Sequence, residues 1–86
     1  MSSEINETLN EFLGAVIIVK LRNKKTIQGN LQDFDSGMNF ILINSKDITE
    51  KDPKNLDKII IRSDNIMAVS LRDKFNSLER KEDVQI

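Results

Sequence analysis

The sequence lacks histidine, cysteine, tryptophan and tyrosine, and it has only 4 phenylalanines among 86 residues. Without histidine it has no imidazole base, no histidine-dependent catalytic triad and no zinc site of the usual histidine-containing kinds. Without cysteine it has no disulfide, no thiol nucleophile and no thiolate metal site. Paired carboxylates are the catalytic arrangement that this composition leaves open, and the sequence marks no acid–base pair in a cleft. We therefore expect a protein that is not an enzyme, with no catalytic residue, no metal site and no cofactor.

Long hydrophobic runs are also missing. The longest apolar stretches, residues 15–19 and 40–43, have the length of a β-strand and are far too short for a membrane-spanning helix. No segment has the pattern of a secretory signal peptide. Because small secreted domains often depend on disulfides, the absence of cysteine favours an intracellular location.

No charge of one sign predominates, since the net charge is −1 and the pI is about 5.4. This balance excludes a protein that binds nucleic acid through a broadly basic surface. Residues 1–14 contain glutamates and no basic residue, whereas residues 15–45 have an excess of basic ones. The basic residues there are Lys20, Arg22, Lys24 and Lys25. They either add sequence-independent phosphate contacts or form a solvated hairpin, so any specific nucleic-acid contact must come from a small site.

The apolar residues that are present favour β structure. Leucine, isoleucine, valine and phenylalanine make up 28 of the 86 residues, and 12 of these are isoleucine, whose branched Cβ suits a strand. The length predicts one domain. Short apolar runs, an alternating run over residues 26–33 and turn residues between them predict five strands, over residues 16–22, 26–33, 39–43, 59–62 and 66–71. Gly29 lies inside the second strand and indicates a sharp bend or a close approach of another backbone. Residues 44–58 form a charged connection that can extend the strands on either side.

The two ends of the chain differ from this central part. Residues 3–13 predict a short helix, with Ser3 as a cap and Gly14 in the left-handed conformation that ends a helix. Its apolar face consists of Ile5, Leu9, Phe12 and Leu13. Residues 72–86 are a charged tail, either a frayed helix or disordered. We therefore divide the chain into a helix (1–14), a barrel (15–71) and a polar tail (72–86).

These elements predict a mainly β fold, in which an N-terminal helix precedes a strongly bent, five-stranded antiparallel sheet that forms a small open barrel. Within the last two strands, 59–62 and 66–71, residues 59–61 and 66–69 are apolar on both faces, so these strands make poor solvent-exposed edges. Pairing the edge of one chain with the edge of the next would bury them and close a ring. The alternative is a monomer whose helix covers one face and whose edges are merely short.

Two segments resemble the signatures of the Sm and Sm-like (LSm) RNA-binding proteins. The first, residues 19–39, follows the pattern V-x-L, a turn, an apolar residue, x-G-x-L and then apolar-D-x-x-M-N. The matching positions are Val19, Leu21, Ile27, Gly29, Leu31, Phe34, Asp35, Met38 and Asn39. The second, residues 60–71, begins I-I-R-S-D-N-I and follows apolar-I-R-G-D/N-apolar, with Ser63 in place of the glycine. The helix and the bent five-stranded sheet also agree with this family.

The resemblance implies a ring, usually of seven subunits, in which the fourth strand of one chain pairs with the fifth of the next. In this chain those strands are residues 59–62 and 66–71. It also implies that uridine-rich single-stranded RNA binds at the inner rim of the ring. Loops of the two signatures meet there and form one base pocket in each subunit.

Carried onto this chain, the resemblance gives four residues a role in the pocket. Asn39 would hydrogen-bond the uracil edge, to which an amide offers both a donor and an acceptor. Arg62 would lay its guanidinium plane against the base. Asp64 would fix its loop and orient its neighbours, and Asp35 would brace the first loop through backbone contacts.

Each role has a simpler alternative. Asn39 follows a turn and could close an Asx-type bend. Arg62 could be a solvated charge or an ion-pair partner for Asp64. Met38 is better explained as an adaptable filler of the core than as a ligand contact.

The sequence departs from the family pattern at three positions. Gly37 stands where the family often has a histidine or an aromatic residue that stacks on the base, a contact worth about 1–3 kcal/mol per base. Ser63 replaces the glycine of the second signature, and its side chain could narrow the pocket or disfavour the usual backbone angles. In the first hairpin Lys24 replaces a glycine, where we expect Asn23 to take any positive φ at little cost.

The sequence therefore supports two functional hypotheses. The first is an RNA-binding subunit of a homo-oligomeric ring, a heptamer, that acts in RNA processing, stability or decay. The second is a structural or scaffold subunit with weakened base pockets, for which Gly37 and Ser63 are the supporting features. The composition suits a small archaeal Sm-like protein in the cytoplasm. A subunit of a mixed eukaryotic ring, which could also act in the nucleus, is the alternative source.

Overall fold

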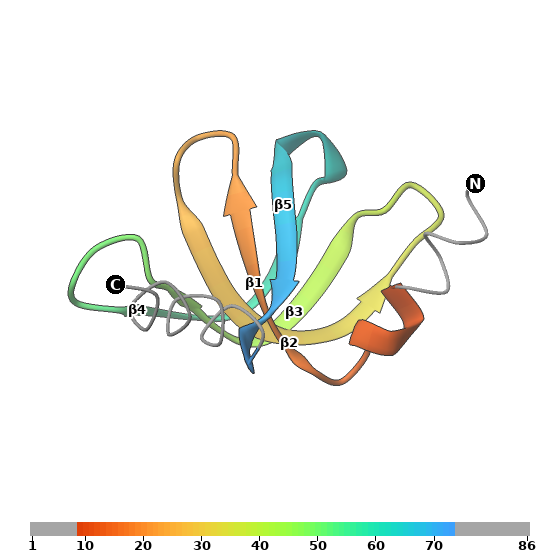
Figure 1. Ribbon diagram of the computed structural model, residues 1–86, viewed down its shortest axis with the longest axis horizontal. Helices are drawn as coiled ribbons and strands as arrows, with labels where there is room; N and C mark the ends of the chain where they lie inside the picture. The colour runs from red at the N-terminus through yellow and green to blue at the C-terminus, as the bar shows by residue number, and fades with distance from the viewer. Residues whose placement is uncertain (1–8, 74–86) are drawn as a thin grey trace, which may run out of the picture.

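The structure is a computed structural model that describes residues 9–73 (Figure 1). It contains the five expected strands: β1 (Val16–Leu21), β2 (Thr26–Phe34), β3 (Phe40–Asp47), β4 (Lys54–Ile61) and β5 (Ile66–Leu71). A short 3-10 turn, η1 (Ser63–Asn65), joins β4 to β5 where we expected a tight turn. Strands β3 and β4 are longer than their apolar runs, because charged residues occupy the exposed positions of their outer ends. The charged connection is therefore shortened to residues 48–53.

All neighbouring strands are antiparallel, and they form a single sheet in the order β4-β3-β2-β1-β5. Figure 1 shows the strands curving around a shared interior, so the predicted bent sheet is confirmed. Strands β4 and β5 are the two edges of this sheet. Each edge exposes a large apolar side chain, since Ile60 on β4 is 68% exposed and Met67 on β5 is 65% exposed.

The core lies on one face of the sheet. Alternation places Ile17, Val19 and Leu21 of β1, and Ile27, Gly29 and Leu31 of β2, inside, because consecutive side chains of a strand point to opposite faces. The buried cluster consists of Leu9, Ile17, Val19, Leu21, Ile27, Leu31, Phe40, Leu42 and Ile61. Met38 packs against this cluster, as predicted for an adaptable side chain at the end of the first signature.

Gly29 permits the close approach that its position in β2 predicts. A Cβ atom at this residue would stand 3.0 Å from Ser45 Oγ and 3.3 Å from the carbonyl oxygen of Ile43. The register between β2 and β3 also shifts between Gln28 and Asn30, so the sheet is irregular around this glycine. The glycine therefore lets the two strands stay close where the sheet bends.

The N-terminal helix ends as predicted. Residues 9–12 are helical, and Gly14 has a φ of +80°. The Gly14 N–H donates to the carbonyl of Leu31 at 2.8 Å, and the Leu31 N–H donates to the carbonyl of Ala15 at 3.1 Å. Leu9, on the last turn, is buried in the core. Residues 3–8 of the predicted helix lie outside the described residues.

The prediction for the first hairpin is wrong in one detail. The positive φ falls on Lys24, at 72°, and Asn23 does not have one. The Lys24 N–H donates to the carbonyl of Leu21 at 3.0 Å, while Asn23 uses its side-chain oxygen to accept the Lys25 N–H at 3.1 Å. A left-handed lysine costs on the order of 1 kcal/mol, so replacing the family's glycine is not free of strain here.

The C-terminal tail is described only at its start, where residues 72 and 73 turn into a helix after β5. The remainder of the tail, residues 74–86, lies outside the described residues. Across residues 9–73 there is no helix with the length and hydrophobicity needed to cross a membrane.

Candidate nucleic-acid interface

The two signature loops meet at one end of the β3–β4 ladder. The first loop (residues 35–39) follows β2, and the second (residues 62–65, including η1) follows β4. Phe40 pairs with Ile61 across the ladder. This pairing places Asn39 and Arg62, the adjacent residue on each strand, at the same edge of the sheet. Residues that are more than twenty positions apart in the sequence therefore form one local site.

Asp35 closes the first loop on itself. One carboxylate oxygen accepts the N–H groups of Gly37 and Asn39, each at 2.9 Å. The other oxygen accepts the Asn39 side-chain amide at 3.1 Å. Hydrogen bonds from the Asn39 backbone, and then from its side chain, hold the pKa of Asp35 below its usual value of 3.8. The backbone bracing expected of Asp35 is thus present, and its carboxylate is ionised at neutral pH.

Asn39 connects the first loop to the second. Its side-chain oxygen accepts the N–H of Ser63 at 2.8 Å, while its side-chain nitrogen donates to Asp35. The Asx-type bend considered for Asn39 is made by Asp35 instead. These two bonds fix the orientation of the amide, and they leave it one N–H hydrogen and one lone pair of its oxygen. A fixed donor beside a fixed acceptor matches the edge of a uracil ring.

The two charged residues of the second loop are exposed and do not pair with each other. Within residues 9–73, neither the Arg62 guanidinium nor the Asp64 carboxylate has a hydrogen bond or an ion pair. Among these residues, the Asp64 side chain therefore makes no contact that would fix the loop, contrary to what we expected. The loop is held through its backbone, and the guanidinium of Arg62 has no partner among residues 9–73.

The two departures from the family pattern that lie in the signature loops, Gly37 and Ser63, have different consequences. Gly37 is exposed, and a Cβ atom there would lie 3.3 Å from the side-chain nitrogen of Asn39 and 3.4 Å from a carboxylate oxygen of Asp35. Ser63 does not have a positive φ, so the predicted conflict with backbone angles is wrong. Ser63 also lines an apolar cavity of about 250 Å³. The other lining residues are Leu9, Met38, Phe40, Ile66 and Val69.

Sequence reasoning missed the contact that Arg22 makes with the second loop. Arg22 follows β1, and its side-chain Nε–H donates to the carbonyl of Asp64 at 3.1 Å. Its backbone N–H donates to the carbonyl of Asn65 at 2.8 Å. The two bonded positions are 42 residues apart, and no spacing or periodicity in the sequence marks such a pair. The sequence offered Arg22 only as one of several basic residues on a hairpin.

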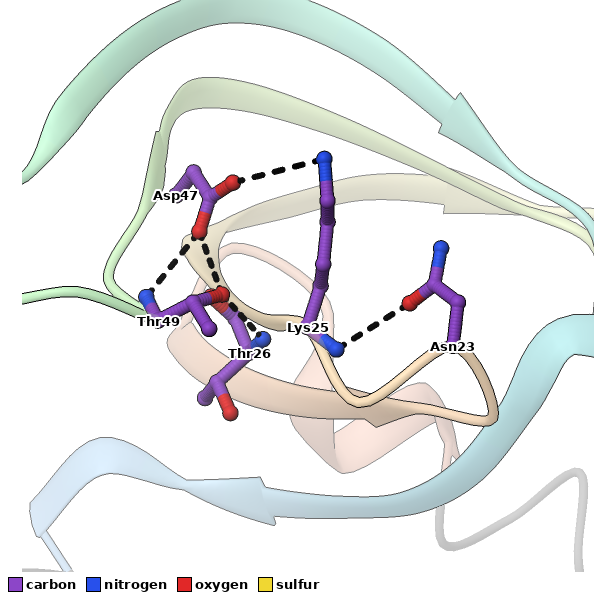
Figure 2. Close-up of polar contacts among 5 residues, drawn as sticks. All are labelled: Asn23, Lys25, Thr26, Asp47 and Thr49. Carbon is purple, nitrogen blue, oxygen red and sulfur yellow. Dashed lines mark hydrogen bonds and ion pairs between the residues drawn. The ribbon is translucent and has the colours of Figure 1, made fainter.

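A second polar cluster ties the first hairpin to the β3–β4 connection (Figure 2). The Asp47 carboxylate accepts the Thr49 N–H at 2.9 Å and the Thr49 hydroxyl at 2.5 Å, and the hydroxyl oxygen accepts the Thr26 N–H at 2.8 Å. The two bonds from Thr49 are the main reason that the pKa of Asp47 is lowered. Lys25 Nζ lies 3.9 Å from the same carboxylate. Lys25 therefore has a partner within the fold and is not simply a solvated cation.

Comparison with known proteins identifies relatives of the whole barrel. Residues 7–71 match the model of the LSM domain family. An Sm-like protein of Methanosarcina barkeri is 30% identical over 71 residues, which cover 81% of this chain and 99% of the relative. A heptameric archaeal Sm protein has a similar structure, with a TM-score of 0.72 at 28% identity, covering 76% of this chain and 96% of that one. The Sm protein of Pyrococcus abyssii, solved with a uridine heptamer, gives a TM-score of 0.71 at 27% identity, covering 77% and 94%.

Proposed function

Because the chain belongs to the LSM domain family, as its two signatures predict, we propose that it is a non-enzymatic subunit of a homoheptameric ring that binds uridine-rich single-stranded RNA. The observation that carries this proposal is the bridge made by Asn39. One amide holds both signature loops, through Ser63 at 2.8 Å and Asp35 at 3.1 Å, and keeps a donor and an acceptor for a ligand.

The base pocket combines this amide with an exposed guanidinium. Asn39 reads the donor–acceptor edge of uracil, and Arg62 stacks on the ring and adds positive potential close to the phosphates. Asp35 supports Asn39 without contacting the base. The pocket has no aromatic side chain at Gly37, so each subunit binds one base weakly. Seven linked pockets on one strand compensate, because each bound base raises the effective concentration of the next.

The ring is supported by the two free edges of the sheet. In the ring, β4 of one chain pairs with β5 of the next, which covers the exposed Ile60 and Met67. The similar heptameric archaeal Sm protein supports seven as the number of subunits. Native mass spectrometry tests this directly, with an expected mass about seven times the 9.9 kDa chain. A monomer at micromolar concentration would contradict the ring.

RNA binding is tested by fluorescence anisotropy with a labelled ten-nucleotide uridine run and a matched adenine run, at two salt concentrations. We expect the uridine run to bind more tightly at both. Arg62→Ala should weaken uridine binding about tenfold, since stacking on one base is worth about 1–3 kcal/mol. Arg72→Ala is the matched control, because it removes one arginine at the far end of β5, where it lies 3.7 Å from Asp73. Equal affinity of Arg62→Ala and the intact protein would contradict the pocket.

The second candidate is a structural or scaffold subunit whose pockets have weakened. The specific observation in its favour is Gly37, which offers no side chain to stack on a base. If this alternative holds, the protein forms the ring but binds uridine and adenine runs equally, and binding disappears as salt rises.

For an RNA-binding ring, we propose a role in RNA processing, stability or decay. RNA recovered with the protein from cells should then be enriched in uridine-rich single strands.

A further inference from the structure

The second signature loop contributes little to its own stability. Residues 62–64 are exposed, and no residue of η1 is buried. Arg62 caps the turn, and no side-chain hydrogen bond supports the cap. Within the loop, the Asn65 N–H donates to the carbonyl of Arg62 at 3.0 Å, and the Ile66 N–H donates to the carbonyl of Ser63. A turn with so few internal contacts takes its position from the residues that hold it from outside.

Among residues 9–73, two residues hold the turn, one from each side. Asn39 accepts the N–H at the start of the turn, from Ser63. Arg22 donates to the two carbonyls at its end, with its side chain to Asp64 at 3.1 Å and its backbone to Asn65 at 2.8 Å. Any residue other than proline preserves the backbone bond. The side-chain bond is specific, because it depends on an N–H at the Nε position of a guanidinium.

We propose that Arg22 is a positioning residue for the base pocket, which fixes the second loop so that the guanidinium of Arg62 is presented to the RNA base. This inference rests on the proposed function. Arg22 does not need to contact RNA in this role. Its Nε–H fixes the carbonyl of Asp64, and the turn that follows Arg62 cannot then move away from Asn39.

A simpler role for Arg22 is a phosphate contact made by its positive charge, as the basic hairpin suggests. The two roles make different demands on the side chain. A phosphate contact needs charge, which lysine keeps. The positioning role needs a donor at Nε, and lysine has a methylene group at that place, with its ammonium one bond further out. Arg22→Lys therefore separates the two roles without changing net charge.

The experiment measures the affinity of the full chain for the labelled ten-nucleotide uridine run. The variants are Arg22→Lys, Arg62→Ala and the double variant, with Lys24→Ala as the control for losing one charge on the same hairpin. We expect Arg22→Lys to bind about threefold to tenfold more weakly, since the lost bond joins a charged donor to a carbonyl. The double variant should bind no more weakly than Arg62→Ala, because Arg22 acts through Arg62. Lys24→Ala should stay within about twofold of the intact protein.

Thermal unfolding and native mass of each variant separate positioning from a general loss of structure. Arg22→Lys should keep the mass of the ring, and its melting temperature should stay close to that of Lys24→Ala. Unchanged affinity of Arg22→Lys, with Arg62→Ala weakened, would overturn the positioning role and leave the proposed function intact. Losses that multiply in the double variant would also overturn it, because the two arginines would then act independently. Unchanged affinity of Arg62→Ala would overturn both the pocket and the role of Arg22.

Discussion

The two signature loops of this protein reach a defined geometry by opposite means. The loop of residues 35–39 is closed by its own aspartate, whose carboxylate accepts three hydrogen bonds within five residues. The loop of residues 62–65 is held from outside, by Asn39 at its start and by Arg22 at its end. The first loop is therefore encoded locally, whereas the second depends on the completed sheet. Substitutions in the first loop, which includes the anchor Asn39, should disturb both loops, and a substitution at the other anchor, Arg22, should disturb only the second.

The largest effect should come from Asn39→Ala. This change removes the proposed contact with uracil, the bond to Asp35 and the anchor of the second loop together. We expect at least about tenfold weaker binding of the uridine run, because a hydrogen bond to the ligand and the position of Arg62 are lost at once. Fluorescence anisotropy measures it, and Asn30→Ala on β2 is the matched control. If the Asn39 variant lost no more affinity than the Asn30 variant, the link between the two loops would not contribute to RNA binding.

A smaller effect is expected for Asp35→Asn, which tests whether the first loop supports the second. The new amide oxygen can still accept from the backbone, but its nitrogen faces the side-chain nitrogen of Asn39, so two donors oppose each other. We expect about fivefold weaker uridine binding. Asp33→Asn removes the same charge nearby and preserves the bond from the Phe34 N–H, so it should bind like the intact protein. Binding by Asp35→Asn at the level of Asp33→Asn would mean that the loops are independent.

The smallest effect should be that of pH on the melting temperature, which changes only under acidic conditions. The pKa of Asp35 is lowered from 3.8 in the folded protein by its bonds to Asn39 and Gly37. A carboxylate with a lowered pKa stabilises the fold above its unfolded pKa, and the contribution is lost as pH falls through the folded value. The melting temperature should thus hardly change between about pH 7 and 5 and should fall below about pH 4. Part of that fall belongs to Asp47, whose pKa is also lowered. Circular dichroism melts of the intact protein and Asp35→Asn should converge at low pH, and a constant difference between them would exclude this role for Asp35.

Much of the fold could be predicted from the sequence because its signals are local. Apolar runs, one alternating run and turn residues marked the five strands, Gly14 marked the end of the helix, and Gly29 marked a close approach, which β2 makes to Ser45. The lengths of β3 and β4 could not be predicted in the same way. Their outer ends carry charges that are typical of loops, and pairing with the neighbouring strand decides that Lys46 and Asn55 belong to the sheet.

In the candidate site, too, local contacts could be predicted from the sequence and long-range contacts could not. Asp35 and Asn39 could be related from the sequence, since they lie four positions apart in one turn. The contact of Arg22 with Asp64 could not, because it spans the sheet, and neither residue carries a pattern that points to the other. The backbone conformation of Ser63 could not be predicted from the sequence either. Ser63 has no positive φ and begins the 3-10 turn that connects β4 and β5, the two opposite edges of the sheet.

The hydrogen bond between Ser63 and Asn39 joins the two signature loops, and a proline at position 63 would remove it. Arg62 already has the extended backbone that a following proline requires, with φ −78° and ψ 141°, and Ser63 begins a 3-10 turn. Ser63→Pro therefore deletes the N–H that Asn39 accepts with little backbone strain, while Ser63→Ala keeps it. In anisotropy titrations, we expect Ser63→Ala to bind the uridine run like the intact protein and Ser63→Pro to bind several-fold more weakly while keeping the ring mass. Equal affinity of the two variants would contradict the claim that the bridge between the loops builds the pocket.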